Sequence, residues 1–325
     1  MLRSRRCGHE PMIQGTHPEE LPAEVLDDVA SVVGAEVTLL GRLSGGVNGG
    51  ATRIQLAGGT AAVLKAVPQA HLNHLDETLR AQRVVEHMRG RGYPTPAWLG
   101  VGATATHVWH LMDLVDAVPA PELTPSLVEQ LMEIIELQAG QASEPYDHWA
   151  YAWRVATGQE PAGAGPDLNE TPEQSRLRRS MARLPGYSSV VSDLVERLRL
   201  VCADVPRPRA APDMVHADLS TPSNILVRDG TVVAVVDIGN AGSGTRAIDL
   251  TNLVWYTFRD PLLDGVRRQL WSRIFDLVGW EGAAMLVAAH ILHMLEIPIR
   301  HGRHDAVPGV VERGHRAVDE LNALR

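Results

Sequence analysis

Residues 214–239 read MVHADLSTPSNILVRDGTVVAVVDIG and contain the pattern that decides the fold. Two short apolar runs rich in β-branched residues, 225–227 and 232–236, flank the pair Asp229-Gly230. Asp-Gly between two such runs is a strong signal for a β-hairpin. The sequence therefore predicts two antiparallel strands joined by a tight turn at this pair.

Four polar side chains surround this predicted hairpin. Asn224 comes just before the first strand and Asp237 just after the second, so the two can share one cation. Asp218 lies six residues before Asn224, and His216 lies two residues before Asp218, where it would brace the loop by hydrogen bonding. A carboxylate can orient and deprotonate an acceptor hydroxyl, while an amide and a second carboxylate can hold magnesium on a triphosphate. The order of these groups favours phosphoryl transfer from a nucleotide.

An upstream region has the pattern of a nucleotide-binding sheet. Three segments read as strands, with a Gly-rich turn between the first two: 37–40, 52–56 and 61–67, with GGVNGG at 45–50. Because glycine has no Cβ, the backbone N–H groups of such a turn can approach phosphate, which makes Gly46 and Asn48 candidate nucleotide contacts. The third strand carries Lys65, the only lysine of the 325-residue chain, as a candidate partner for the phosphates.

These residues resemble the catalytic segment of the aminoglycoside phosphotransferase family, which shares the kinase-like fold with choline kinases and protein kinases. The counterparts of the family motifs are His216-Ala217-Asp218-Leu219, Asn224, Asp237-Ile238-Gly239 and Asp249-Leu250. The resemblance implies that Asp218 is the catalytic base, with His216 beside it, and that Asn224 and Asp237 are magnesium ligands. Asp249 could cap the helix that follows it or tie the catalytic loop down.

The chain departs from the family pattern at two places. Ala217 stands where glycine is usual, and Asn224 follows Asp218 by six residues instead of five. If the loop does not absorb the extra residue, Ser223 and not Asn224 would face the metal.

The resemblance also implies an α+β, two-lobed, protein-kinase-like fold. A small antiparallel β-sheet with one main helix would form an N-terminal nucleotide-binding lobe at 23–115, after a flexible tail at 1–22. A mainly helical C-terminal lobe at 116–325 would hold the catalytic and substrate sites. The connector between the lobes would contact adenine through backbone groups at Asp113 and Val115.

A helix predicted at 76–89 would supply an acid to pair with Lys65. Glu77 is the first choice for this acid and Glu86 the second. Gln82 is the third, as a replacement for the acid, because it lies near the usual position of the glutamate. For each candidate, a solvated charge on the helix surface is the competing interpretation.

Composition limits the classes to which the protein can belong. No apolar run reaches about 18 residues, so no membrane partner is expected. The two cysteines, Cys7 and Cys202, are not a disulfide framework and fit a cytoplasmic protein. The net charge of −9 argues against nucleic acid as a partner and is compatible with a cationic substrate. A monomer or a homodimer is expected.

The expected function is ATP-dependent, or GTP-dependent, O-phosphorylation of a small molecule with Mg²⁺ as cofactor. The favoured substrate is an antibiotic, such as an aminoglycoside, a basic cyclic peptide or a macrolide, whose modification would confer resistance. A metabolic kinase for choline, homoserine or a sugar is the second interpretation. The third is a protein that binds nucleotide without catalysis, since the loop spacing and the helix acid depart from the family pattern.

Overall fold

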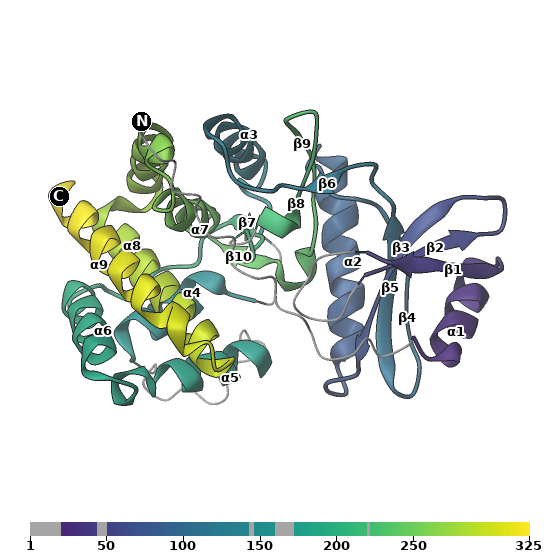
Figure 1. Ribbon diagram of the computed structural model, residues 1–325, viewed down its shortest axis with the longest axis horizontal. Coiled ribbons are helices and arrows are strands. Elements are labelled where there is room, and N and C mark those ends of the chain that lie inside the picture. Colours follow the sequence, from purple (N-terminus) through teal and green to yellow (C-terminus); the bar gives the residue numbers. More distant parts are fainter. Residues whose placement is uncertain (1–20, 44–50, 143–145, 160–171, 220–221) are drawn as a thin grey trace, which may run out of the picture. The chain divides into compact units, whose positions relative to one another are not determined.

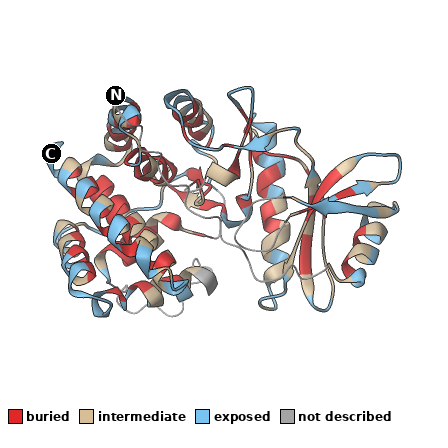
Figure 2. Ribbon diagram, in the orientation of Figure 1, coloured by how far each residue is buried: buried red, intermediate tan, exposed pale blue. Residues whose placement is uncertain are grey.

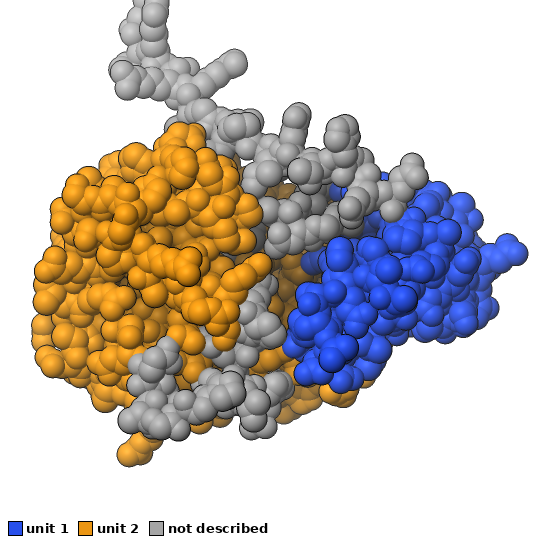
Figure 3. All heavy atoms as spheres, turned by 90° about the horizontal axis from the view of Figure 1, so that it is seen from below, with its two compact units in different colours: residues 1–79, 98–114 blue, residues 80–97, 115–325 orange. Residues whose placement is uncertain are grey.

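The computed structural model describes residues 21–43, 51–142, 146–159, 172–219 and 222–325. The chain divides into two compact units, which Figure 3 colours separately. One unit comprises the chain up to Leu79 together with Trp98–Leu114, and the other comprises Arg80–Ala97 and Val115–Arg325. This grouping differs from the predicted lobes in residues 80–97 and at Val115. The predicted tail at 1–22 lies outside the described residues except for its last two.

An antiparallel sheet of five strands forms the core of the first unit within its described residues, in the order β1-β2-β3-β5-β4 (Figure 1). The strands are β1 (Val37–Arg42), β2 (Thr52–Leu56), β3 (Ala61–Pro68), β4 (Trp98–Ala103) and β5 (His107–Asp113). The three strands predicted around the Gly-rich turn, the last of which carries Lys65, are confirmed as β1 to β3.

Helix α1 (Ala23–Val33) covers one face of this sheet. The shared apolar core consists of Val25, Val29, Ile54, Ala62, Leu64, Trp109 and Leu111. Trp109 donates its indole N–H to Asp28 Oδ2 of α1 at 2.7 Å, which adds a polar tie to the apolar contact. Lys65 follows Leu64 along β3, so the alternation of a strand directs Lys65 to the face opposite α1.

Helices make up most of the described part of the second unit, and α7 is buried along nearly its whole surface (Figure 2). They are the C-terminal part of α2 (His74–Gly90), α3 (Pro125–Glu136), α4 (His148–Thr157), α5 (Pro172–Met181), α6 (Ser189–Val201), α7 (Ala247–Thr257), α8 (Asp264–Arg300) and α9 (Val307–Ala323). Thr124 begins α3 by accepting a hydrogen bond from Leu127 N at 3.2 Å. The predicted helical character of the chain after Asp249 is confirmed by α7, α8 and α9.

Two small antiparallel sheets position the loops of this unit. Strands β6 (Val118–Pro119), β8 (Ile225–Arg228) and β9 (Thr231–Val235) form one sheet, and β7 (Asp213–Val215) with β10 (Gly242–Gly244) form the other. The predicted hairpin is β8–β9. Asp229 and Gly230 at its turn have φ of 51° and 76°, as a two-residue type I′ turn requires.

Helix α8 is the longest element of the second unit. The stretch Pro261–Arg300 is long and apolar enough to cross a membrane by composition, with a mean hydropathy of 1.6 over its most apolar window. Yet 67% of that window is buried inside the chain, as in a core helix. Gly279, with φ of 66°, interrupts the helical backbone in the middle.

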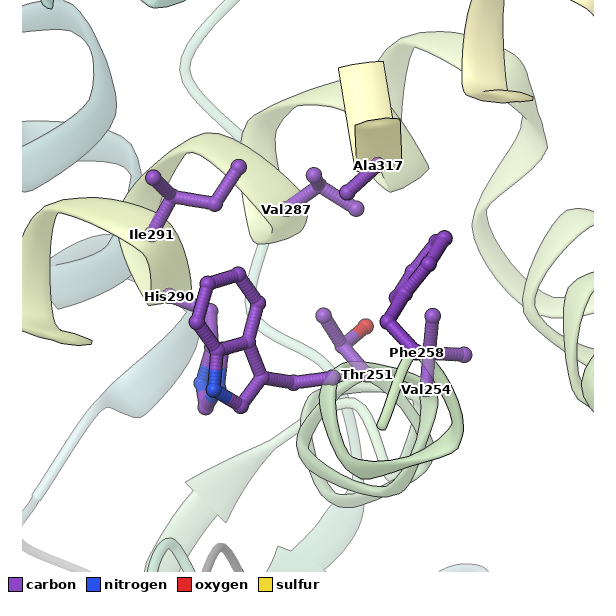
Figure 4. Close-up of a pocket in the computed structure, with 8 residues that line it drawn as sticks. Thr251, Val254, Phe258, Val287, His290, Ile291 and Ala317 are labelled. Atoms are coloured by element: carbon purple, nitrogen blue, oxygen red, sulfur yellow. The ribbon is translucent and has the colours of Figure 1, made fainter. Parts of the chain in front are cut away.

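A small cavity lies in the helical core, between α7, α8 and α9 (Figure 4). It is lined by Thr251, Val254, Trp255, Phe258, Val287, His290, Ile291 and Ala317. Its volume of about 10 Å³ is close to the space of one water molecule, so it is not a substrate site. Burial among these apolar groups lowers the pKa of His290 to about 3.

Candidate active site

The loop that follows β7 carries the predicted catalytic residues. His216 is fully buried, whereas Asp218 is half-buried and Leu219 anchors the far side of the turn in the core. Ala217 has φ of 68°, in the left-handed region where glycine is favoured. The glycine that the family usually has at this position therefore has a backbone explanation, and alanine tolerates the conformation at a cost of about 1 kcal/mol.

Asn224 contacts Asp218 directly. Its amide Nδ2 donates to the backbone oxygen of Asp218 at 2.8 Å and to the carboxylate Oδ2 at 3.0 Å. Asn224 itself is buried and ends the short turn Pro222–Asn224 directly before β8; residues 220 and 221, which precede this turn, lie outside the described part of the chain. The contact across the longer loop favours Asn224 over Ser223 as the residue that faces a metal, a role that stays a proposal.

Asp237 lies at the same open end of the hairpin as Asn224, just after its second strand. Val236 N donates to Asn224 O at 2.9 Å, so backbone pairing holds the residues before and after the hairpin together. Asp237 has φ of 66° and ψ of 43°, a left-handed conformation that ends the strand and starts a short turn at Ile238. Aspartate is one of the few residues other than glycine that adopt this conformation readily.

His216 holds the catalytic loop from inside. Its ring Nε2 lies 3.0 Å from Val236 O, to which it donates, and Nδ1 accepts from Asp218 N at 3.2 Å. Both ring nitrogens are therefore used in fixing the loop, with the proton on Nε2. The bracing role expected from the sequence agrees with this geometry, since the ring is fully buried and both of its nitrogens hydrogen-bond the backbone around Asp218 and Asp237.

Asp249 fixes the backbone of the same loop. Its Oδ2 accepts from His216 N at 2.8 Å, and its Oδ1 accepts from Ala217 N at 3.0 Å. Gln138 Nε2, from the turn after α3, donates to Oδ2 at 3.0 Å. Burial raises the pKa of Asp249, and the three N–H donors act in the opposite direction because they stabilise the ionised carboxylate. Of the two roles predicted for Asp249, the structure shows the loop tie.

The predicted nucleotide contacts of the first unit are only partly described. Gly46 and Asn48 lie outside the described residues. Lys65 is half-buried on β3, directly across from His110 of β5. Asp113 ends β5 as an exposed residue. Val115, the first residue of the second unit after this strand, accepts a hydrogen bond from Ala117 N at 2.9 Å.

The three candidates for the acid of α2 differ in their surroundings. Glu77, in the first turn, lies in the same compact unit as Lys65, and its Oε2 is 3.4 Å from His71 Nε2. Glu86 is exposed and Gln82 is half-buried, and both lie in the part of α2 that groups with the second unit. Glu77 therefore stays the first choice, as a proposal.

Several side chains that support the site were not predicted. Besides Gln138, they include Arg80 of α2 and His148 of α4, whose contacts are with the segment after Asp237. A signal for Arg80 was present, because it falls in line with Val84 and Met88 on the apolar stripe of an amphipathic helix. A cation at such a position predicts a specific buried partner.

Comparisons with known proteins agree with the fold. Residues 42–286 match the model of the phosphotransferase enzyme family. No curated protein sequence matches the chain. Among solved structures, a thermostable mutant of aminoglycoside phosphotransferase APH(4)-Ia, in complex with ADP and hygromycin B, superposes with a TM-score of 0.62 and 16% identity over 91% of this chain and 98% of that one.

Two further solved structures share the fold. The amicoumacin kinase hAmiN, in complex with AMP-PNP and Ca²⁺, has a TM-score of 0.59 and 12% identity over 94% of this chain and 97% of its own. A protein assigned as a fructosamine-3-kinase from Thermobifida fusca has a TM-score of 0.56 and 23% identity over 91% and 98%. The predicted α+β kinase-like fold is confirmed by these matches.

Proposed function

Because the chain belongs to the phosphotransferase enzyme family, we propose that it transfers the γ-phosphoryl group of ATP, or of GTP, to a hydroxyl group of a small molecule. The observation that carries this proposal is the contact between Asn224 and Asp218 in a loop held by His216 and Asp249. This arrangement presents a fixed carboxylate beside an amide, at the open end of a hairpin that also bears Asp237.

Asp218 is the proposed catalytic base. The bond from Asn224 Nδ2 to its Oδ2 fixes the orientation of the carboxylate, and the bond from its own N–H to His216 fixes its backbone. A carboxylate held in this way can align an acceptor hydroxyl with the γ-phosphorus and take the proton as the new P–O bond forms and the bond to the leaving phosphate oxygen breaks.

Asn224 and Asp237 are the proposed magnesium ligands. Asn224 commits its Nδ2 to Asp218, so the amide oxygen is the end of that side chain left to meet a cation. With the Asp237 carboxylate it gives the all-oxygen donor set that Mg²⁺ prefers. Magnesium supplies neutralisation of the charge that develops on the phosphates. Lys65 would grip the α- and β-phosphates with Glu77 as its partner.

The remaining nucleotide contacts are proposed from the resemblance. Gly46 and Asn48 would cover the phosphates through backbone N–H groups, and the backbone at Asp113 and Val115 would meet the adenine. The similarity in fold to a complex that contains ADP and to one that contains AMP-PNP supports nucleotide binding.

The favoured acceptor is an antibiotic, namely an aminoglycoside, a basic cyclic peptide or a macrolide, with resistance as the outcome. Two of the solved structures with this fold are complexes of antibiotic kinases, one of them with hygromycin B. The net charge of −9 is compatible with a cationic acceptor. A cytoplasmic monomer or homodimer that needs neither nucleic acid nor membrane fits this role.

A metabolic kinase is the second candidate function. The observation that favours it is the similarity in fold to the protein assigned as a fructosamine-3-kinase, which at 23% has a higher identity than the two antibiotic kinases above. Choline, homoserine or a sugar would then be the acceptor. Binding of nucleotide without catalysis is the third.

The variant Asp218→Asn tests the proposed chemistry. It preserves the shape of the side chain but removes the base, so turnover of the acceptor should fall by about 10²-fold or more, the range for loss of a general base. Nucleotide affinity, measured by calorimetry, should stay within about twofold of the parent, because Asp218 does not bind nucleotide. The exposed Asp276→Asn is the matched control. Unchanged turnover in Asp218→Asn would refute the role of Asp218.

A further inference from the structure

The backbone that follows Asp237 is held by buried side chains at three successive carbonyl groups. Arg80 donates from Nη2 to Gly239 O at 3.0 Å and from Nη1 to Ala241 O at 2.6 Å. Between them, His148 Nε2 donates to Asn240 O at 2.8 Å. All of these residues belong to the helical unit. Together the two side chains form a clamp that begins two residues after Asp237.

The guanidinium of Arg80 is itself fixed. Only 8% of the Arg80 side chain area is exposed, and its Cζ lies 4.3 Å from the centre of the Tyr146 ring. Two carbonyls on one planar fork, with an aromatic ring on its face, are a geometry that arginine satisfies and lysine does not. At this buried position of α2, Arg80 therefore donates hydrogen bonds that an apolar residue could not make.

The far end of the clamped segment is also fixed. Tyr146 O accepts from Ser243 N at 2.7 Å. A Cβ at Gly242 would lie 2.7 Å from Tyr146 Cβ, so only glycine allows this approach. The segment 239–243 is thus held along its whole length.

This clamp helps to hold Asp237 in one backbone conformation. Aspartate enters the left-handed region more readily than most residues other than glycine, but the region is sparsely populated, so a single fixed conformation there needs support from the neighbouring segments. At Asp237, with φ of 66°, the hairpin fixes the preceding residue and the clamp fixes the following ones. Because the side chain leaves the backbone at Cα, fixing the backbone on both sides of Asp237 limits the directions that its carboxylate can take.

We propose that Arg80 and His148 are positioning residues, which hold the Asp237 carboxylate in the geometry that binds the magnesium–nucleotide complex. The inference rests on the proposed function of Asp237 as a metal ligand. In this proposal α2 has a second role besides supplying an acid to pair with Lys65, because its Arg80 holds the segment that follows Asp237.

Nucleotide binding with and without Mg²⁺ tests this inference. Calorimetry with the full chain would give the affinity for AMP-PNP in excess Mg²⁺ and in EDTA. In Arg80→Lys the metal-free affinity should stay within about twofold, whereas the gain in affinity from Mg²⁺ should fall by about tenfold, the lower end for loss of a group that orients a metal ligand. Arg83→Lys, an exposed arginine on the same helix, is the matched control and should keep the full gain.

A second readout follows the backbone itself. Peptides that cover residues 238–243 should exchange their amide hydrogens faster in Arg80→Lys than in Arg83→Lys, since the clamp limits opening of this segment. His148→Phe, which keeps a ring but cannot donate to Asn240 O, should show a similar increase in exchange.

Three results would overturn the inference, and they are distinguishable. A full Mg²⁺ gain in a folded Arg80→Lys would refute the positioning role and leave the proposed function standing. Unchanged amide exchange over 238–243 in both Arg80→Lys and His148→Phe would also refute the positioning role and leave the proposed function standing. A parent protein whose AMP-PNP affinity does not depend on Mg²⁺ would refute the metal site and, with it, this inference.

Discussion

Replacement of the Asp249 carboxylate by an amide should loosen the catalytic loop. Asp249→Asn preserves the volume of the side chain but has one acceptor oxygen in place of two. In the parent, the two oxygens accept from His216 N, Ala217 N and Gln138 Nε2, at 2.8, 3.0 and 3.0 Å. In either orientation of the new amide, at least one backbone N–H of the loop would face its NH₂ group.

The expected loss of stability follows from the number of hydrogen bonds that the substitution removes. A hydrogen bond to a charged acceptor contributes about 1.5–3 kcal/mol, and a buried donor left without a partner costs a similar amount. Removal of a buried negative charge offsets part of the loss, because burial disfavours the ionised form of Asp249. We therefore expect the free energy of unfolding to fall by about 2 kcal/mol in Asp249→Asn. It should fall by about 4 kcal/mol in Asp249→Ala, which removes every acceptor and leaves a cavity.

Thermal unfolding followed by circular dichroism measures this effect. A loss of about 2 kcal/mol corresponds to a decrease in Tm of roughly 4–8 °C for a unit of this size. The same substitution at the exposed Asp204, Asp204→Asn, should change Tm by about 1 °C or less. The reasoning would be refuted if Asp249→Asn were as stable as Asp204→Asn, or if it were less stable than Asp249→Ala.

Three further predictions concern packing, backbone conformation and pH. Gly102→Ala should lower the free energy of unfolding, measured with denaturant, by about 1–3 kcal/mol, because the added Cβ would lie 2.7 Å from a carbon of the buried Trp109 indole. In the control Gly100→Ala, the added Cβ would lie 3.4 Å from its nearest neighbour, so the loss should be much smaller. Ala217→Gly should raise the unfolding free energy by about 0.5–1 kcal/mol, since φ at this position is 68°; a decrease would contradict the strain. Burial lowers the pKa of His148 to about 4 and that of His290 to about 3, so below pH 6.5 the unfolded chain binds more protons than the folded chain. The unfolding free energy should therefore fall by roughly 2 kcal/mol per histidine between pH 7 and pH 5, and the variant His290→Leu should have a shallower pH slope.

The sequence predicted those parts of the site that local signals determine. Asp229-Gly230 between two apolar runs predicted the β8–β9 hairpin, and the apolar segments upstream predicted β1, β2 and β3. The positions of Asn224 and Asp237 at the ends of this hairpin followed from its connectivity alone. The role of His216 as a brace was predictable because it lies so close to Asp218 in the chain.

Contacts between distant segments were not predictable from one sequence. Helix α1 and strand β4 were not predicted. Both pack against Trp109 of β5, a contact between segments that are far apart in the sequence. On α2, Arg80 is buried, although charged side chains usually lie at the surface. The partners of Arg80 lie about 160 residues away, at Gly239 and Ala241, so the apolar stripe of α2 could indicate a buried partner but not which groups supply it.

The central claim is that this chain phosphorylates a small molecule. The most direct test is ATP consumption in the presence of Mg²⁺ against a panel of aminoglycosides, basic cyclic peptides, macrolides, choline, homoserine and simple sugars, with mass spectrometry of each acceptor and Asp218→Asn in parallel. The account predicts that one acceptor gains a single phosphate with the parent protein and none with Asp218→Asn. Binding of Mg²⁺–ATP without modification of any acceptor would contradict the claim and favour a protein that binds nucleotide without catalysis.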